Sequence, residues 1–140
     1  MRLNNFGIGA ALVMSFAVGS LVTTSIQAQN KRVFELRTYH TLPGRLPALQ
    51  ARFRDHTVAL FKRHGMTNIG YWTPQDAPVA ENTLIYIIAH ESREAAKKNW
   101  DGFRADPEWQ QVSKASEADG KIVEKVESVY MDATDYSPIK

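Results

Sequence analysis

An acid, a base and a phenol alternate along one short segment of the chain, at Glu35, Arg37 and Tyr39. Residues 33–40 are rich in β-branched and aromatic side chains with a period of two, which predicts a strand with these three groups on one face. Polar groups on a buried face need partners. We favour an ion-pair and hydrogen-bond network that ties two copies of the chain together. The alternative is that Arg37 or Tyr39 binds an anionic or carbonyl group of a ligand.

A lone histidine, His56, falls inside an apolar stripe that predicts a helix over residues 45–64. The stripe returns at helical spacing through Leu46, Leu49, Phe53, Thr57 and Leu60. At 100° per residue, His56 lies within about 20° of Leu49 and about 40° of Leu60, so it is predicted to face the sheet. Such an imidazole is either a hydrogen-bonded core group or a proton carrier in a ligand cavity.

Several classes of catalytic and metal site lack their signatures. The chain has no cysteine, which excludes thiol catalysis and thiolate metal sites. His40, His64 and His90 end predicted elements without HxH or HxxxH spacing, so we predict no metal site, although His40 and His90 could approach each other on neighbouring strands. No P-loop, dinucleotide-binding motif or G-x-S-x-G motif occurs, and no cofactor is expected.

Two further segments predict strands that complete a sheet. Residues 66–73 carry Tyr71 and Trp72 and stop at Pro74. Residues 84–89 are apolar at every position, so both faces of the sheet should be covered at this strand. One small domain has too few helices to cover both faces, which predicts that a second copy covers the other.

Ser92 and Asp106 have the residue types that begin helices, and the first of these helices carries Trp100. Residues 122–131 predict the last strand, and residues 132–140 a tail with little to fold. The resulting order, β-α-β-β-α-β, predicts an α+β, ferredoxin-like sandwich with a four-stranded antiparallel sheet and helices on one face.

Residues 1–28 predict a secretory signal peptide, with Arg2 before an apolar run over 6–22 and Ala28 at the cleavage site. An uncleaved membrane anchor is the alternative. We predict cleavage, export to the periplasm or the exterior, and one domain over residues 29–140. Without Arg2, 16 Lys and Arg balance 15 Asp and Glu, and this interspersed charge argues against nucleic-acid binding.

A set of short motifs carries a family resemblance. They are Glu35-Leu36-Arg37-Thr38-Tyr39, a helix holding His56 and followed by His64-Gly65-Met66, Tyr71-Trp72, Trp100 with Phe103, and Asp106-Pro107-Glu108-Trp109. In this order they resemble the NIPSNAP family of the ferredoxin-like dimeric α/β-barrel group. The resemblance implies a homodimeric α/β barrel and no particular reaction. Relatives in the wider group include cofactor-independent monooxygenases, haem-binding and haem-degrading enzymes and small-lactone isomerases, which hold ligands between the sheet and the helices.

We therefore predict an exported NIPSNAP-like protein that binds a small apolar or aromatic molecule between sheet and helices. The candidate ligand-binding residues are His56, Arg37, Tyr39, Tyr71, Trp72 and Trp100. The alternative is a cofactor-independent oxygenase or isomerase for a small aromatic or enolisable substrate, with His56 as proton carrier and Tyr39, Tyr71 or Trp72 orienting the ring. A pocket that holds His56 beside a tyrosine or an arginine would favour this alternative.

Overall fold

The computed structural model describes residues 32–140, so the predicted signal peptide lies outside the described residues. The elements in chain order are β1 (Val33–Thr41), α1 (Leu46–Arg52), η1 (Phe53–Thr57), α2 (Val58–Arg63), β2 (Thr67–Trp72), η2 (Val79–Glu81), β3 (Thr83–His90), α3 (Arg93–Ala105), α4 (Pro107–Ser116) and β4 (Val123–Asp132). No helix within residues 32–140 combines the length and the apolar character needed to cross a membrane.

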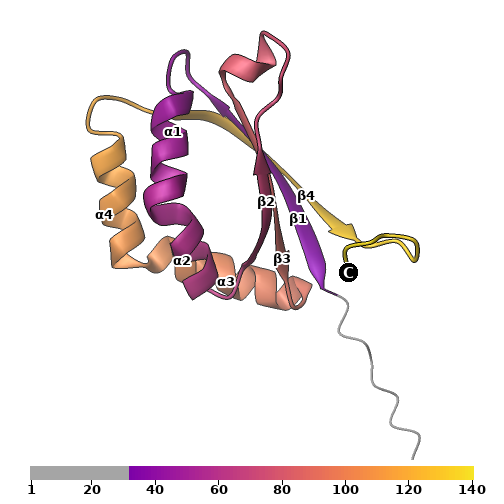
Figure 1. Ribbon diagram of the computed structural model, residues 1–140. Helices are drawn as coiled ribbons and strands as arrows, with labels where there is room; N and C mark the ends of the chain where they lie inside the picture. Colours follow the sequence, from indigo (N-terminus) through magenta and orange to yellow (C-terminus); the bar gives the residue numbers. More distant parts are fainter. Residues whose placement is uncertain (1–31) are drawn as a thin grey trace, which may run out of the picture.

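The four strands form one antiparallel sheet in the order β2-β3-β1-β4, and the long helices lie on one face of it (Figure 1). This confirms the predicted ferredoxin-like α+β fold. Both predicted helix caps are present, because the Ser92 hydroxyl accepts from the amide of Ala95 and the Asp106 carboxylate accepts from the amide of Glu108. Each cap satisfies an amide that has no partner within its own helix.

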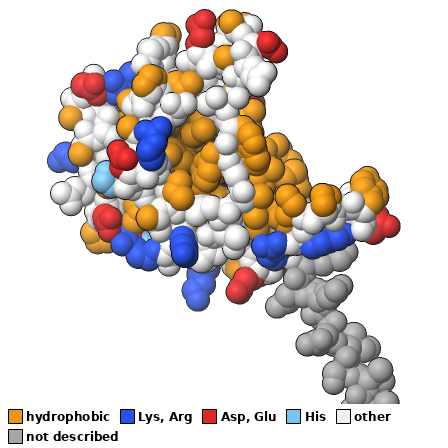
Figure 2. Space-filling view, in the orientation of Figure 1, with side chains coloured by type: hydrophobic (Ala, Val, Ile, Leu, Met, Phe, Trp, Pro, Cys, Tyr) orange, Lys and Arg blue, Asp and Glu red, His pale blue; other side chains and the backbone are white. Residues whose placement is uncertain are grey.

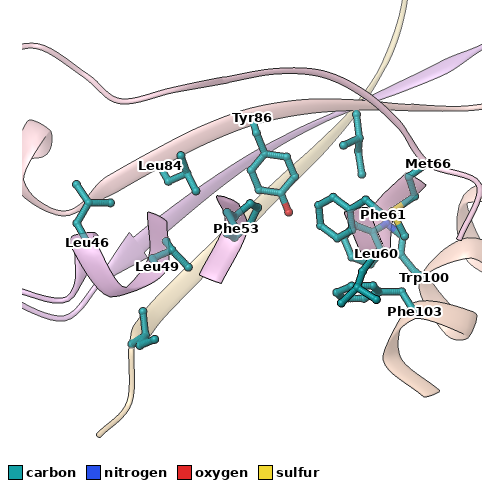
Figure 3. Close-up of a cluster of buried hydrophobic side chains, with 12 residues drawn as sticks. Leu46, Leu49, Phe53, Leu60, Phe61, Met66, Leu84, Tyr86, Trp100 and Phe103 are labelled. Carbon is teal, nitrogen blue, oxygen red and sulfur yellow. The ribbon is translucent and has the colours of Figure 1, made fainter. Parts of the chain in front are cut away.

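Strand register decides which side chains meet the helices. Glu35, Arg37 and Tyr39 on β1 stand opposite Ile88, Tyr86 and Leu84 on β3, and both sets face the helices. The core between sheet and helices combines aromatic side chains with aliphatic ones (Figure 3). Its centre is the fully buried Tyr86, whose ring centroid lies 5.2 Å from that of Phe53 and 5.8 Å from that of Phe61.

The predicted helix over residues 45–64 is interrupted by a π-helical turn, η1. Here the amide of Val58 donates to the carbonyl of Phe53, five residues back, and the Thr57 hydroxyl donates to the carbonyl of Arg52. A π turn holds one more residue than an α turn, which shifts the residues that follow around the helix axis. Thr57 therefore lies on the buried side of the helix, which packs against the sheet. His56 is exposed as a result, and the prediction that it faces the sheet is wrong.

No helix within residues 32–140 lies over the opposite face of the sheet, which is largely apolar (Figures 1 and 2). Val129 on β4 is 55% exposed there, opposite the partly buried Leu36 on β1. As predicted, residues 133–140 form no helix or strand, and their side chains line a hollow on this face together with Phe34 and Ile87. Residues 32–140 leave the rest of this face uncovered.

Candidate functional site

The Glu35 carboxylate is the hub of a buried hydrogen-bond network, and its residue is only 1% exposed. It accepts from Arg37 Nη1 at 2.7 Å, His90 Nε2 at 3.0 Å, Trp100 Nε1 at 2.7 Å and the Ser128 hydroxyl at 2.7 Å. Burial alone would raise the pKa of Glu35, but the four donors, His90 foremost, outweigh burial and lower the pKa to about 2. Glu35 is therefore ionised near neutral pH.

This network joins β1, β3, β4 and α3 within one chain, so it needs no second copy to satisfy its polar groups. Because a carboxylate only accepts, His90 carries its proton on Nε2, and its Nδ1 accepts from the Asn99 side chain at 3.2 Å. Glu35 in turn orients Arg37, whose guanidinium carbon lies 4.3 Å from the centroid of the Trp100 ring. Glu35 and Arg37 are thus paired as predicted, but Tyr39 takes no part in the network, which supports Arg37 and Trp100 within one chain where a link between two copies was predicted.

A cavity of about 470 Å³ opens beside this network, between α3 and strands β1 and β4. It is lined by Glu35, Arg37, Arg93, Lys97, Trp100, Arg104, Ser128 and Tyr130, and we call it the basic pocket. Lys97 and Arg104 each contact the Asp101 carboxylate, at 2.7 and 2.6 Å, while the Arg93 guanidinium carbon lies 3.3 Å from the centroid of the Tyr130 ring. Even with Glu35 and Asp101 counted, the four basic side chains leave a surplus of positive charge.

Of the six predicted ligand-binding residues, the structure places Arg37 and Trp100 in the basic pocket. Tyr39 is next to them, with its ring centroid 5.6 Å from the Arg37 guanidinium carbon and 5.4 Å from the Tyr86 ring. Tyr71 also faces the helices, but it stacks on Tyr86 in the core and donates its hydroxyl to Asn68. Burial raises the pKa of Tyr71, so it remains a neutral phenol.

Trp72 belongs to the other side of the sheet. It follows Tyr71 in β2 and stands opposite Ile85, so its side chain leaves on the face without helices, where it is 51% exposed. Its ring covers Gly70, because a Cβ atom added at Gly70 would lie 2.5 Å from the ring. The Trp72 ring is therefore not between sheet and helices as predicted, although the residue borders a hollow at the β2 edge together with Phe53 and Tyr71.

His56 lines a second cavity, an open groove of about 540 Å³. One wall of this groove is formed by α1 and η1, and the other by α4. Arg52, Asp55 and Glu108 also line this groove, so His56 does share a pocket with an arginine. The groove lies outside the layer between sheet and helices. His56 is thus apart from Arg37 and Trp100, the candidates that the fold brings together.

His40 and His90 do not approach each other. His40 stands opposite Thr83 and His90 opposite Val33, at opposite ends of the β1–β3 pair, so the suggested proximity of His40 and His90 is wrong. Within residues 32–140 no group of three or more potential metal ligands is found.

Sequence reasoning missed most of the charged lining of the basic pocket. Arg93, Lys97, Trp100 and Arg104 are spaced four, three and four residues apart, which places them on one face of a helix and was visible in the sequence. Ser128 gave no comparable signal, because its role depends on pairing with Arg37 across the sheet.

Comparisons with known proteins agree on the family. The NIPSNAP profile matches residues 34–138. No protein with a curated function matches the sequence. A NIPSNAP family protein of unknown function from Agrobacterium tumefaciens has 24% identity and a TM-score of 0.69, with 80% of this chain and 96% of that chain covered. A NIPSNAP-like domain protein from Burkholderia xenovorans has 18% identity and a TM-score of 0.67, with 78% and 90% covered.

A more distant likeness is to SnoaB, a cofactor-independent oxygenase from Streptomyces nogalater, with 15% identity, a TM-score of 0.52, and 77% of this chain and 98% of that chain covered. Identities this low show a shared fold alone. The profile match spans most of the chain, and together with the observed fold it identifies this protein as a member of the NIPSNAP family.

Proposed function

We propose that this protein binds a small, partly apolar anion in the basic pocket. The observation that carries the proposal is the convergence of Arg37, Arg93, Lys97 and Arg104 on one cavity whose only acid, Glu35, already accepts four hydrogen bonds. A negative group on a ligand would balance the surplus positive charge, and the Trp100 ring would contact its apolar body.

Binding fits the ionisable groups of this region better than catalysis does. The pKa of Glu35 is lowered to about 2 and that of Tyr71 is raised, so neither group exchanges a proton readily near neutral pH. A cofactor-independent oxygenase or isomerase remains the alternative. It is supported by the groove that His56 shares with Arg52 and, weakly, by the fold shared with SnoaB.

The partner and the location are part of the same proposal. A second copy of the chain would cover the open apolar sheet face around Leu36 and Val129, which gives the homodimeric α/β barrel. The signal peptide over residues 1–28 would direct the protein to the periplasm or the exterior and leave no membrane anchor after cleavage.

Calorimetric titration of the mature protein with benzoate, and with benzamide as its neutral counterpart, tests the pocket. We expect benzoate to bind more tightly. Arg93→Gln should weaken benzoate binding, whereas Arg54→Gln, which removes an exposed arginine from another part of the surface, should not. Equal affinity for benzoate and benzamide would contradict the proposal, and so would an Arg93→Gln variant that binds benzoate as well as the parent does.

A further inference from the structure

Helix α4 lies beside α1 and η1 and runs in the opposite direction (Figure 1). Two contacts establish this direction, because Arg52 donates to the Ser116 hydroxyl at 3.3 Å while Arg63, at the end of α2, donates to Glu108 at 2.7 Å. The groove of about 540 Å³ that His56 lines runs between these elements, and none of its described lining residues also lines the basic pocket. Its volume suits a small organic molecule.

The two ends of this groove differ in character, because antiparallel packing places the start of α1 opposite the end of α4. One end is lined by small apolar side chains, those of Ala48, Ala51, Val112 and Ala115. The other end is lined by polar side chains, those of Asp55, His56, Glu108 and Gln111. Arg52 lies between the two ends in chain order. A ligand that follows the groove would therefore meet apolar groups, a cation and then acids.

Arg52 has few acceptors for a buried cation. Its side chain is only 5% exposed, and its one hydrogen bond within residues 32–140 is the long bond to Ser116. Its Nε has no partner there, and the nearest carboxylate in the described residues, that of Glu117, lies 3.7 Å away. The Trp109 ring, with its centroid 5.4 Å from the guanidinium carbon, compensates only in part. An acceptor group on a ligand in the groove would stabilise this cation.

Asp55 offers the opposite charge in the same groove. The π turn η1 carries Asp55 and His56, and turns of this kind are frequent at functional sites. Glu108 is already paired with Arg63, whereas Asp55 is exposed and forms no ion pair within residues 32–140. Asp55 follows Arg52 by three residues, which is about one helical turn, so the groove presents a donor and an acceptor close together.

We propose that this groove binds an apolar α-amino acid as a zwitterion, with the carboxylate at Arg52, the ammonium group at Asp55 and the aliphatic side chain against the alanines. A simple acid would place its carboxylate near Asp55 without a cation of its own, and a simple amine would leave Arg52 without an acceptor. A zwitterion satisfies both groups. This site is separate from the basic pocket and takes another class of ligand, so it goes beyond the proposed function.

Titration with L-leucine, followed by NMR, tests the site. The backbone amide resonances of Gln111 and Ala115 report on the groove, because neither residue lines the basic pocket. L-Leucinamide keeps the ammonium group but has no carboxylate, so it should bind at least about tenfold more weakly than leucine. The groove is open, so exchange should be fast, and a titration detects a ligand that purification would remove.

Two variants at exposed positions remove one feature of the groove each. Asp55→Asn should weaken leucine binding at least about tenfold, and Ala115→Leu, which fills the apolar end, should abolish it. Asp76→Asn and Ala59→Leu make the same changes at exposed positions that do not line the groove, so both should bind leucine like the parent. Thermal melts of all four variants verify that they are folded.

Three results would overturn the proposal. They are Gln111 and Ala115 resonances that do not respond to leucine, equal affinities for leucine and leucinamide, and an Asp55→Asn variant with the parent's affinity. The basic pocket can fail separately, because Arg93→Gln should leave the leucine-induced shifts unchanged and Asp55→Asn should leave benzoate affinity unchanged. Loss of the leucine-induced shifts in Arg93→Gln would assign leucine to the basic pocket and would also contradict the groove.

Discussion

His90 donates to Glu35 across the β1–β3 pair at 3.0 Å, and both side chains are almost completely buried. The two residues are not directly opposite in the ladder, because Glu35 stands opposite Ile88 and His90 opposite Val33. The contact is therefore diagonal, on the face that meets the helices. It fixes the carboxylate that in turn holds Arg37 and Trp100, so the geometry of the basic pocket depends on this pair.

Replacing the hub should destabilise the fold. Glu35→Gln removes the charge that four donors share and leaves Arg37 without its carboxylate, which should cost about 3 kcal/mol of unfolding free energy, as for breaking a buried ion pair. Denaturant unfolding measures this change. Glu127→Gln, on the exposed side of β4, is the matched control and should shift the midpoint little. Equal midpoints for Glu35→Gln and the parent would mean that the network contributes no net stability.

Stability should fall in acid because of the same carboxylate. The pKa of Glu35 is about 2 in the folded protein against 4.5 as its ordinary value, so its contribution is complete above pH 4.5 and is lost as the pH falls toward 2. The loss should be on the order of 3 kcal/mol. Unfolding free energies measured across this range for the parent and for Glu35→Gln isolate the effect. Parallel pH curves for the two proteins would contradict it.

Replacement by glutamine should destabilise the protein more at His64 than at His56. His56 is exposed, so His56→Gln should change the unfolding free energy by less than about 0.5 kcal/mol. His64 Nε2 lies 2.6 Å from the Asp106 carboxylate, which caps α4, so His64→Gln should lower the melting temperature more. If His56→Gln abolished the turnover of an aromatic substrate while preserving the fold, the enzymatic alternative would replace the binding proposal.

The proposed dimer should be sensitive to charge on one side of β4 only. Val129→Asp places a carboxylate on the open apolar face and should weaken self-association at least about tenfold, because an unpaired charge would be buried. Val126→Asp, on the same strand but on the face toward the helices, is the control and should leave the association intact. Sedimentation equilibrium distinguishes the two variants. A parent protein that is monomeric and folded at micromolar concentration would exclude the dimer.

The features predicted correctly from the sequence are those set by local patterns. Segments of period two or of continuous apolar residues locate the strands, and the hydroxyl of Ser92 and the carboxylate of Asp106 cap their helices as their residue types indicate. The error at His56 has a physical cause, because the π turn changes the helical phase and an ideal period of 3.6 residues contains no sign of it. Ser128 was not predicted to bind Glu35, since 93 residues separate the two and only the sheet register joins them.

Native mass spectrometry of the protein purified from its native host tests the central claim most directly. The account predicts a bound small molecule with an anionic group, which Arg54→Gln retains and Arg93→Gln loses. A neutral ligand that is retained equally by both variants would contradict the account, and so would an empty parent protein that does not take up benzoate.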